Sequence, residues 1–138
     1  MLLAVVVSSF NNQTTINKSI DSILRFKEKL KNWDVKITIV DDASTDDTSA
    51  VILDYIYLNP IISLKQFAKN GGVSRSRNFG IDSNLDSDYL LFVDGDDELD
   101  IMLADYLNQN ELTNDLYGFD FNIINAVSYT HLRAHETV

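Results

Sequence analysis

The sequence contains no cysteine, a single proline and five glycines in 138 residues. Without cysteine, the chain can form neither a disulfide framework nor a zinc site with thiolate ligands. The low content of proline and glycine argues against a disordered or fibrous protein. No apolar run approaches the roughly 18 residues of a membrane span. The opening run, Leu2 to Val7, is too short for a signal peptide and has no basic residue before it, so we expect a first β-strand there.

Positive charge is also scarce, because 11 Lys and Arg residues stand against 21 Asp and Glu residues, giving a net charge of −10. A nonspecific nucleic-acid binder needs a basic surface to neutralise phosphates, so we expect no nucleic-acid partner. A phosphate ligand stays compatible with this charge if a bound cation neutralises it. The hydrophobic content of 45% and the length are those of one soluble globular domain, or a piece of one.

Apolar runs alternate with segments of helical periodicity along the chain. The runs predict strands at Leu2 to Val7, Val35 to Val40, Ile61 to Phe67, Tyr89 to Val93 and Tyr117 to Ile124. Helical spacing predicts a helix capped by Thr14 or Thr15 with an apolar stripe from Ile16 to Leu30, and helices at Ala50 to Leu58, Val73 to Ile81 and Ile101 to Leu107. The alternation predicts an α/β fold with a mostly parallel sheet. Ligands of such sheets bind beyond the carboxyl ends of the strands.

Polar residues follow each of the first four predicted strands directly. They are Ser8, Ser9, Phe10, Asn11 and Asn12 after the first, Asp41 and Asp42 after the second, Asn70, Gly71 and Gly72 after the third with Arg75, Arg77 and Asn78 beyond them, and Asp94 and Asp96 after the fourth. Each cluster alone is a weak signal, because an acidic loop is usually only solvated and "NGG" is usually a plain turn.

The pair Asp94 and Asp96 is more specific. Residues two apart on a strand point to the same face, so both carboxylates can reach one point, and Gly95 between them lets a ligand approach the backbone. Hard oxygen donors of this kind suit Mg²⁺ or Mn²⁺. A calcium loop is a poorer match, because Leu99 stands where the sharp turn needs glycine. Arg77 could neutralise a diphosphate together with the metal, or it could form a surface salt bridge.

Four segments, in this order, resemble motifs of family 2 glycosyltransferases, enzymes of the GT-A fold that use nucleotide-diphosphate sugars. "VVVSSFNNQTTINKSIDSIL" resembles the family opening, with Phe10 at the usual Tyr position, Asn11 at the usual Asn and Ser8 where Pro is common. "IVDDASTDDT" is similar to the Val-Asp-Asp-Gly-Ser block, with Ala43 in the glycine place. "NGGVSRSRNFGI" resembles the Asn-x-Gly-x-x-x-Ala-Arg-Asn segment, with Ser76 for Ala, and "FVDGDD" resembles the Asp-x-Asp signature.

The resemblance covers Leu2 to about Asp100 and implies a GT-A sheet with helices on both faces. It implies that Ser8, Asp41 and Asp42 hold the base and ribose of UDP, and that Arg77 reaches the diphosphate or the donor sugar. The implied nucleotide-sugar-binding set is Ser8, Phe10, Asn11, Asp41, Asp42, Asn70, Gly72, Arg77 and Asp94. The implied ligands of Mn²⁺ or Mg²⁺ are Asp94 and Asp96.

By the same resemblance, the reaction transfers a sugar to an acceptor hydroxyl with inversion, and an Asp or Glu acts as general base. That base lies well beyond the Asp-x-Asp motif in the family, so we expect this chain to lack it, to bind UDP weakly and to transfer little or no sugar. The acceptor, a glycan or a lipid-linked sugar, is not identified. We expect a cytoplasmic location, with attachment to the inner face of the membrane through further C-terminal parts left open.

The C-terminal residues Val127 to Thr137 differ in character from the rest, and they resemble the conceptual translation of a transposon-end sequencing adapter. We therefore expect residues 1–126 to be the nucleotide-sugar-binding part of a C-terminally incomplete GT-A domain, and 127–138 to be a non-native tail. On the same ground we set aside a metal site at His131 and His135.

Two alternative functions remain. A non-catalytic nucleotide-binding fragment would share the donor residues. A sugar nucleotidyltransferase is a poorer match, because it would show a glycine-rich basic loop where this chain has "SSFNNQTT".

Overall fold

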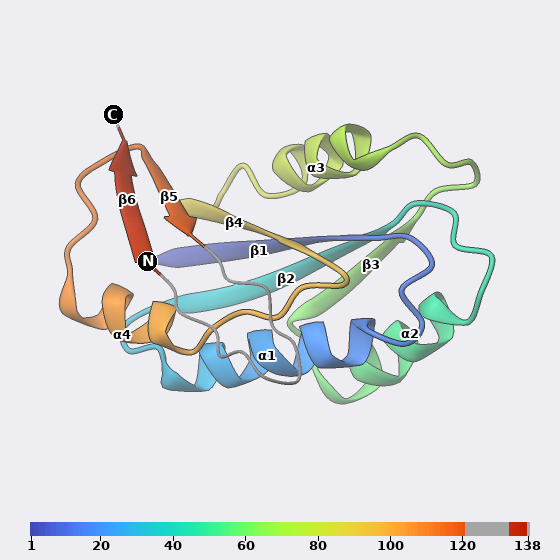
Figure 1. The fold of residues 1–138 in the computed structure, drawn as a ribbon, viewed down its shortest axis with the longest axis horizontal. Helices are drawn as coiled ribbons and strands as arrows, with labels where there is room; N and C mark the ends of the chain where they lie inside the picture. The colour runs from blue at the N-terminus through green and yellow to red at the C-terminus, as the bar shows by residue number, and fades with distance from the viewer. Residues whose placement is uncertain (121–132, 138) are drawn as a thin grey trace.

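The computed structural model describes residues 1–120 and 133–137, which form two sheets and four helices (Figure 1). The elements run in the order β1 (Leu2–Ser9), α1 (Ile16–Lys29), β2 (Asp34–Asp41), α2 (Thr48–Leu58), β3 (Ile62–Gln66), α3 (Val73–Asp82), β4 (Tyr89–Asp94), α4 (Met102–Gln109), β5 (Leu116–Asp120) and β6 (Arg133–Thr137). The alternation of strands and helices predicted from the sequence is confirmed from β1 to α4.

The main sheet has the strand order β3-β2-β1-β4, and all of its pairs are parallel. The strand β1 lies in the middle, where Ser9 is paired with Asp41 of β2 and Ser8 with Asp94 of β4. Three strands therefore end at the same level, and the polar residues that follow them gather at one edge of the sheet. We call this the carboxyl edge.

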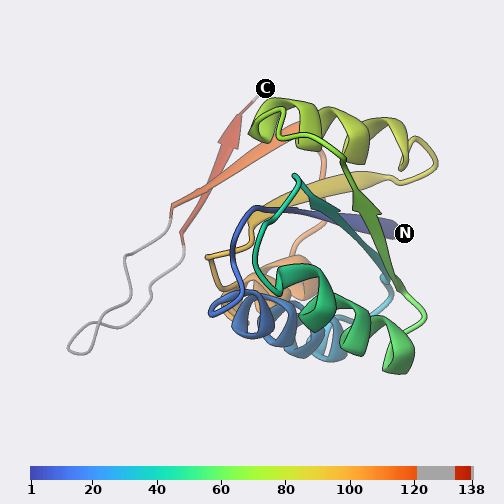
Figure 2. The same cartoon turned by 90° about the vertical axis from the view of Figure 1, so that its right-hand side faces the viewer.

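Helices cover both faces of this sheet, as predicted. Figures 1 and 2 show α3 on one face and α1, α2 and α4 on the other. The strand β1 is buried from Leu3 to Val7, as expected for a central parallel strand covered on both sides. The apolar stripe of α1 packs into the same core, with Ile16, Ile20, Ile23 and Phe26 fully buried.

The strand β4 confirms the strand predicted at Tyr89 to Val93, but it is less buried than a continuous apolar run suggests. Val93 is buried, but the side chain of Phe92 is 40% exposed. The reason is the strand order, since β4 is an outer strand of the parallel sheet and has a neighbour only on its β1 side among the described residues. A continuous apolar run therefore marked a strand correctly without showing its place in the sheet.

The predicted fifth strand is confirmed over Tyr117 to Asp120, and its remaining residues lie outside the described part of the chain. It does not join the parallel sheet. Instead β5 pairs antiparallel with β6 in a separate two-stranded sheet. The strand β6 falls within the predicted non-native tail, whose origin stays a prediction, and His131 lies outside the described residues.

Helices of the described residues are all too short or too polar to cross a lipid bilayer.

Candidate active site

The loops after β1 and β2 are joined by hydrogen bonds at the carboxyl edge. The backbone N–H of Asn11 donates to the Ser44 hydroxyl at 2.9 Å, and the side-chain oxygen of Asn11 accepts from the Thr45 N–H at 2.8 Å. The backbone N–H of Asn12 donates to the Thr48 hydroxyl at 2.9 Å. The side-chain oxygen of Asn11 thus binds the neighbouring loop, whereas the nearby ring of Phe10 is 45% exposed.

The two acids at the carboxyl end of β2, Asp41 and Asp42, are both buried and have different partners. The carboxylate of Asp41 accepts hydrogen bonds from the hydroxyl and the backbone N–H of Ser44, which closes the turn at the end of β2. The carboxylate of Asp42 accepts from the backbone N–H groups of Gly71 and Gly72 at 2.9 and 2.8 Å and from the Arg75 guanidinium at 2.9 Å.

These partners outweigh the effect of burial on Asp42. Burial raises the pKa of the Asp42 carboxyl. The hydrogen bonds from Gly71, Arg75 and Gly72 lower the pKa by more than burial raises it, so that it lies below its ordinary value. Asn70 contacts the same residue, because its side-chain amide donates to the Asp42 carbonyl at 3.2 Å. Asp42, Asn70 and Gly72, all predicted site residues, therefore form one connected group.

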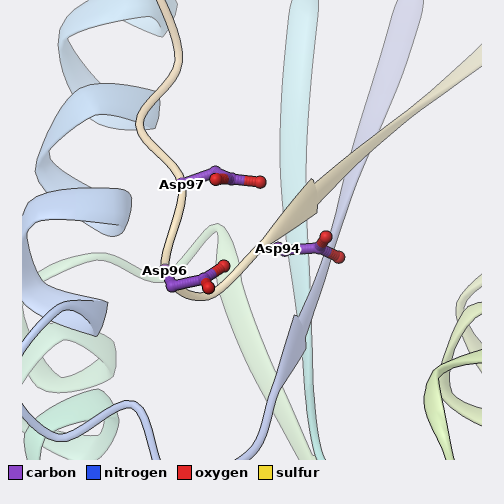
Figure 3. Close-up of side chains that lie close together, drawn as sticks. All are labelled: Asp94, Asp96 and Asp97. Atoms are coloured by element: carbon purple, nitrogen blue, oxygen red, sulfur yellow. The ribbon is translucent and has the colours of Figure 1, made fainter. Parts of the chain in front are cut away.

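An acidic cluster follows β4 and consists of Asp94, Asp96 and Asp97. One carboxylate oxygen of each lies within 4.8 Å of the others, and Figure 3 shows the three carboxylates on the same side of the loop. The pKa of the Asp97 carboxyl is raised above its ordinary value, first by burial and then by the negative charges of Asp96 and Asp94. The cluster can hold a divalent cation, because its ligands are hard oxygens gathered at one point.

The local geometry of this cluster corrects one argument made from the sequence. We attributed the approach of Asp94 and Asp96 to their alternation along a strand, but β4 ends at Asp94. A turn follows, closed by a hydrogen bond from the Asp97 N–H to the Asp94 carbonyl at 2.9 Å. The turn also brings in Asp97, which we did not include as a metal ligand although it stands next to Asp96 in the sequence.

Gly95 has a different role from the one expected, because its neighbours belong to the protein. Its N–H donates to the Ser8 carbonyl at 2.7 Å. A Cβ atom at this position would lie 2.6 Å from the Asn12 side-chain oxygen and 3.1 Å from the Ser8 carbonyl oxygen. Glycine is therefore required here by the close packing of the acidic turn against the loop after β1.

Arg77 lies beside the acidic cluster. Its guanidinium donates to the Asp94 carboxylate at 3.3 Å, and the guanidinium carbon lies 5.8 Å from the centre of the Phe92 ring. Both members of the ion pair are more than 40% exposed, so the pair contributes little to stability. What the arrangement provides is a positive charge next to a candidate cation site, which is suited to a ligand with several negative oxygens.

A parallel sheet covered by helices on both faces, with an acidic cluster and an arginine at its carboxyl edge, defines an α/β protein of the GT-A type. The family model described as "Glycosyl transferase family 2" matches residues 4–135. The chain therefore belongs to glycosyl transferase family 2.

Individual relatives agree with this assignment. The poly(ribitol-phosphate) beta-N-acetylglucosaminyltransferase TarP of Staphylococcus aureus is 32% identical over 116 residues, which cover 81% of this chain and 34% of TarP. The Escherichia coli glucosyltransferase WfgD is 27% identical over 129 residues, which cover 90% of this chain and 47% of WfgD. The chain thus spans between a third and a half of the length of these two relatives.

A solved structure is similar over most of the described chain. The crystal structure of S. aureus TarS residues 1–349 in complex with UDP-GlcNAc superposes with a TM-score of 0.63 and 26% sequence identity, over 77% of this chain and 30% of TarS.

Proposed function

We propose that this chain forms the donor-binding part of a glycosyltransferase that uses a UDP-sugar and a divalent cation, Mn²⁺ or Mg²⁺. The observation that carries the proposal is the acidic cluster of Asp94, Asp96 and Asp97 within 4.8 Å, with Arg77 paired to one of its members. Its position at the carboxyl edge is where ligands of parallel α/β sheets bind. The presence of UDP-GlcNAc in the TarS crystal structure supports a UDP-sugar as the donor.

In this proposal the nucleoside lies over the ends of β1 and β2, and the diphosphate lies toward β4. Ser8, Phe10 and Asp41 stand at the nucleoside end, where the exposed Phe10 ring offers an apolar face to the base. Arg77 and the acidic cluster stand at the diphosphate end. The full proposed donor set is Ser8, Phe10, Asn11, Asp41, Asp42, Asn70, Gly72, Arg77 and Asp94, with Asp94 and Asp96 as metal ligands.

The reaction is displacement at the anomeric carbon, with inversion. The bond from that carbon to the diphosphate oxygen breaks while a bond to the acceptor oxygen forms, and the acceptor proton passes to a general base. A cation held by Asp94 and Asp96 would offset the negative charge that develops on the leaving diphosphate. Arg77 adds a positive charge from the chain itself, and Asp94, which it contacts, keeps that charge at the diphosphate end.

The general base and the acceptor site would lie in further parts of a longer enzyme, since TarP and WfgD are both two to three times the length that this chain matches. We therefore expect the 138-residue chain to bind the donor without turnover. A glycan or lipid-linked acceptor is proposed because WfgD, by its name, acts on a diphosphoundecaprenol-linked sugar. A lipid-linked acceptor would place the enzyme at the cytoplasmic face of the membrane.

The test is calorimetric titration of the chain with UDP in the presence and absence of Mn²⁺. We expect Mn²⁺ to strengthen UDP binding, and Asp96→Asn to weaken binding in Mn²⁺ by about tenfold or more, which corresponds to the loss of about 1.4 kcal/mol. The matched control is Asp54→Asn, which removes the same charge from an exposed position of α2 and should bind as the wild type does. UDP binding that is equal with and without Mn²⁺ would contradict the metal role, and no binding at all would contradict the donor role.

A further inference from the structure

The side chain of Arg75, in the first turn of α3, joins three segments that are distant in sequence. Its guanidinium carbon lies 3.8 Å from the centre of the Phe67 ring, directly after β3. The guanidinium donates to the Asp42 carboxylate at 2.9 Å, at the end of β2, and to the Lys69 carbonyl. A planar, charged group that stacks on a ring and pairs with a carboxylate at once has one well-defined position.

Asp42 completes this arrangement from the other side. Its two carboxylate oxygens accept from the Gly71 and Gly72 N–H groups as well as from Arg75, and its side chain is only 6% exposed. We call the group of Asp42, Phe67, Gly71, Gly72 and Arg75 the Arg75 clasp. It differs from the Lys–Asp pairs elsewhere on the described surface, whose carboxylates are exposed and which have little structural effect.

The two glycines of the clasp are needed for different reasons. A Cβ atom on Gly71 would lie 2.2 Å from the Nε atom of Arg75, so the guanidinium packs directly on the Gly71 backbone. Gly72 has open space around it, but its φ of +91° is a conformation that side-chain-bearing residues rarely adopt. Both glycines thus serve the contact between the clasp and the start of α3.

Arg75 and Arg77 lie on opposite sides of α3, because two residues along a helix correspond to a rotation of about 200°. Arg75 contacts Asp42 at the end of β2, and Arg77 contacts Asp94 at the end of β4. The strand β1 lies between these two strands in the sheet. The N-terminal half of α3 therefore contacts the carboxyl edge on both sides of β1, once through each arginine.

We propose that Arg75 is a positioning residue for donor binding, which holds the first turn of α3 so that Arg77 stays beside the acidic cluster. The inference rests on the proposed function, since it concerns the diphosphate end of the same donor site. Arg75 acts through the position of Arg77 and does not contact the diphosphate itself. Its contacts with Asp42, Phe67 and Lys69 all lie on the β2 and β3 side of α3.

The first experiment compares UDP with uridine, which lacks the diphosphate. In Arg75→Met the apolar stem remains and the guanidinium is lost, so the dissociation constant for UDP in Mn²⁺ should rise about tenfold. That for uridine, measured by NMR titration, should rise by about threefold at most, because Arg75 contacts the nucleoside end only through Asp42. The matched control is Lys65→Met, because the Lys65 ammonium lies 5.7 Å from the centre of the same Phe67 ring without an ion pair to any carboxylate of the described residues. An equal loss for UDP and uridine would contradict the proposal, since general damage to the fold would affect both ligands.

A double variant tests whether Arg75 acts through Arg77. Arg75→Met combined with Arg77→Met should bind UDP as weakly as Arg77→Met alone, because a positioning residue has no effect once the group that it positions is absent. Additive losses would show that Arg75 acts independently and would overturn the proposal.

A final measurement requires no nucleotide, so that it separates this inference from the proposed function. In the free protein, Arg75→Met should speed solvent exchange of the Gly71 and Gly72 amide protons about tenfold and shift the side-chain NMR signal of Arg77, whereas Lys65→Met should do neither. Unchanged exchange and an unchanged Arg77 signal would overturn the clasp. If Arg75→Met shows these effects but the wild type binds no UDP, the clasp is supported and the proposed function is contradicted.

Discussion

Two residues with positive φ shape the loops next to the nucleoside end of the site. Asn11 has a φ of 49° and Ala43 a φ of 65°. Asparagine tolerates the left-handed region, but alanine at such a position costs about 1–2 kcal/mol. The conformation persists because Ser44, the next residue, donates to Asp41 and accepts from the Asn11 N–H. The strain at Ala43 is therefore the cost of joining the two loops.

We predict that Ala43→Gly stabilises the protein by about 0.5–1 kcal/mol. Glycine adopts the left-handed conformation without the energetic penalty that alanine has there. Its greater conformational freedom in the unfolded chain cancels part of this stabilisation. Urea unfolding measures the change. The control Ala50→Gly lies in an exposed position of α2, where the same substitution should destabilise by about 1 kcal/mol. A loss of stability in Ala43→Gly would show that the alanine conformation is not strained.

At the scale of elements, α3 packs directly against the sheet at Gly80. A Cβ atom at this position would lie 2.2 Å from a Cγ atom of Val6, which is fully buried in the middle of β1. A β-branched side chain in a packed core cannot turn away, so a larger residue at Gly80 must move the helix. Because Arg75 and Arg77 both lie on α3, its distance from β1 affects the whole carboxyl edge.

Gly80→Ala should therefore destabilise the fold by about 1 kcal/mol or more, since overpacking of about 1–3 kcal/mol exceeds the gain of about 1 kcal/mol in helix propensity. The double variant with Val6→Ala provides the test, because the space freed on β1 can receive the new methyl group. Its loss of stability should be clearly smaller than the sum of the two single losses. Additive losses, within about 0.5 kcal/mol, would rule out a direct contact.

The connection between β2 and α3 through Asp42 should depend on pH. The folded-state pKa of Asp42 lies below its ordinary value of about 3.9, so the folded protein binds fewer protons here than the unfolded chain does. The stabilisation is then fully present above the unfolded pKa, and it is lost as the pH falls through the folded pKa.

Wild type should accordingly be more stable than Asp42→Asn at neutral pH, and the difference should shrink as the pH falls below about 4. Urea unfolding midpoints at a series of pH values measure this difference in stability. The titration of the other carboxylates contributes equally to both proteins and therefore cancels in the difference. A difference that stays constant down to the lowest pH at which the fold survives would contradict the role of the Asp42 charge. The exposed control Asp54→Asn should show no such difference.

At the scale of the whole molecule, stability should respond to salt in two separable ways. One arises from the net charge of −10 and the other from cation binding at the acidic cluster. Sodium chloride should raise the unfolding midpoint modestly by screening general repulsion. Mn²⁺ at matched ionic strength should raise the midpoint further, because binding to the acidic cluster adds about 2.7 kcal/mol to the free energy of unfolding at a hundredfold excess over the dissociation constant. Thermal unfolding distinguishes the two, since Asp96→Asn should keep the sodium response and lose the manganese response. Equal responses to both salts in the wild type would contradict a specific cation site.

Much of this architecture follows from local patterns in the sequence. The apolar runs and the stripe on α1 predicted the parallel βαβ order, because buried strands and amphipathic helices each have their own periodicity. Polar residues directly after the strands predicted a shared edge, since parallel strands end on the same side. These features depend on spacing along the chain, which a reader of the sequence can see.

Tertiary structure alone decided the features that depend on contacts between distant residues. Phe92 is exposed because β4 is an outer strand, and Asp97 joins Asp94 and Asp96 through a turn. The sequence by itself marked Asp42 and Arg75 as separate polar residues, 33 positions apart. Only the folding of α3 across the ends of the strands brings them within 2.9 Å, because the position of a helix on a sheet is set by the summed packing of both surfaces, which local spacing does not specify.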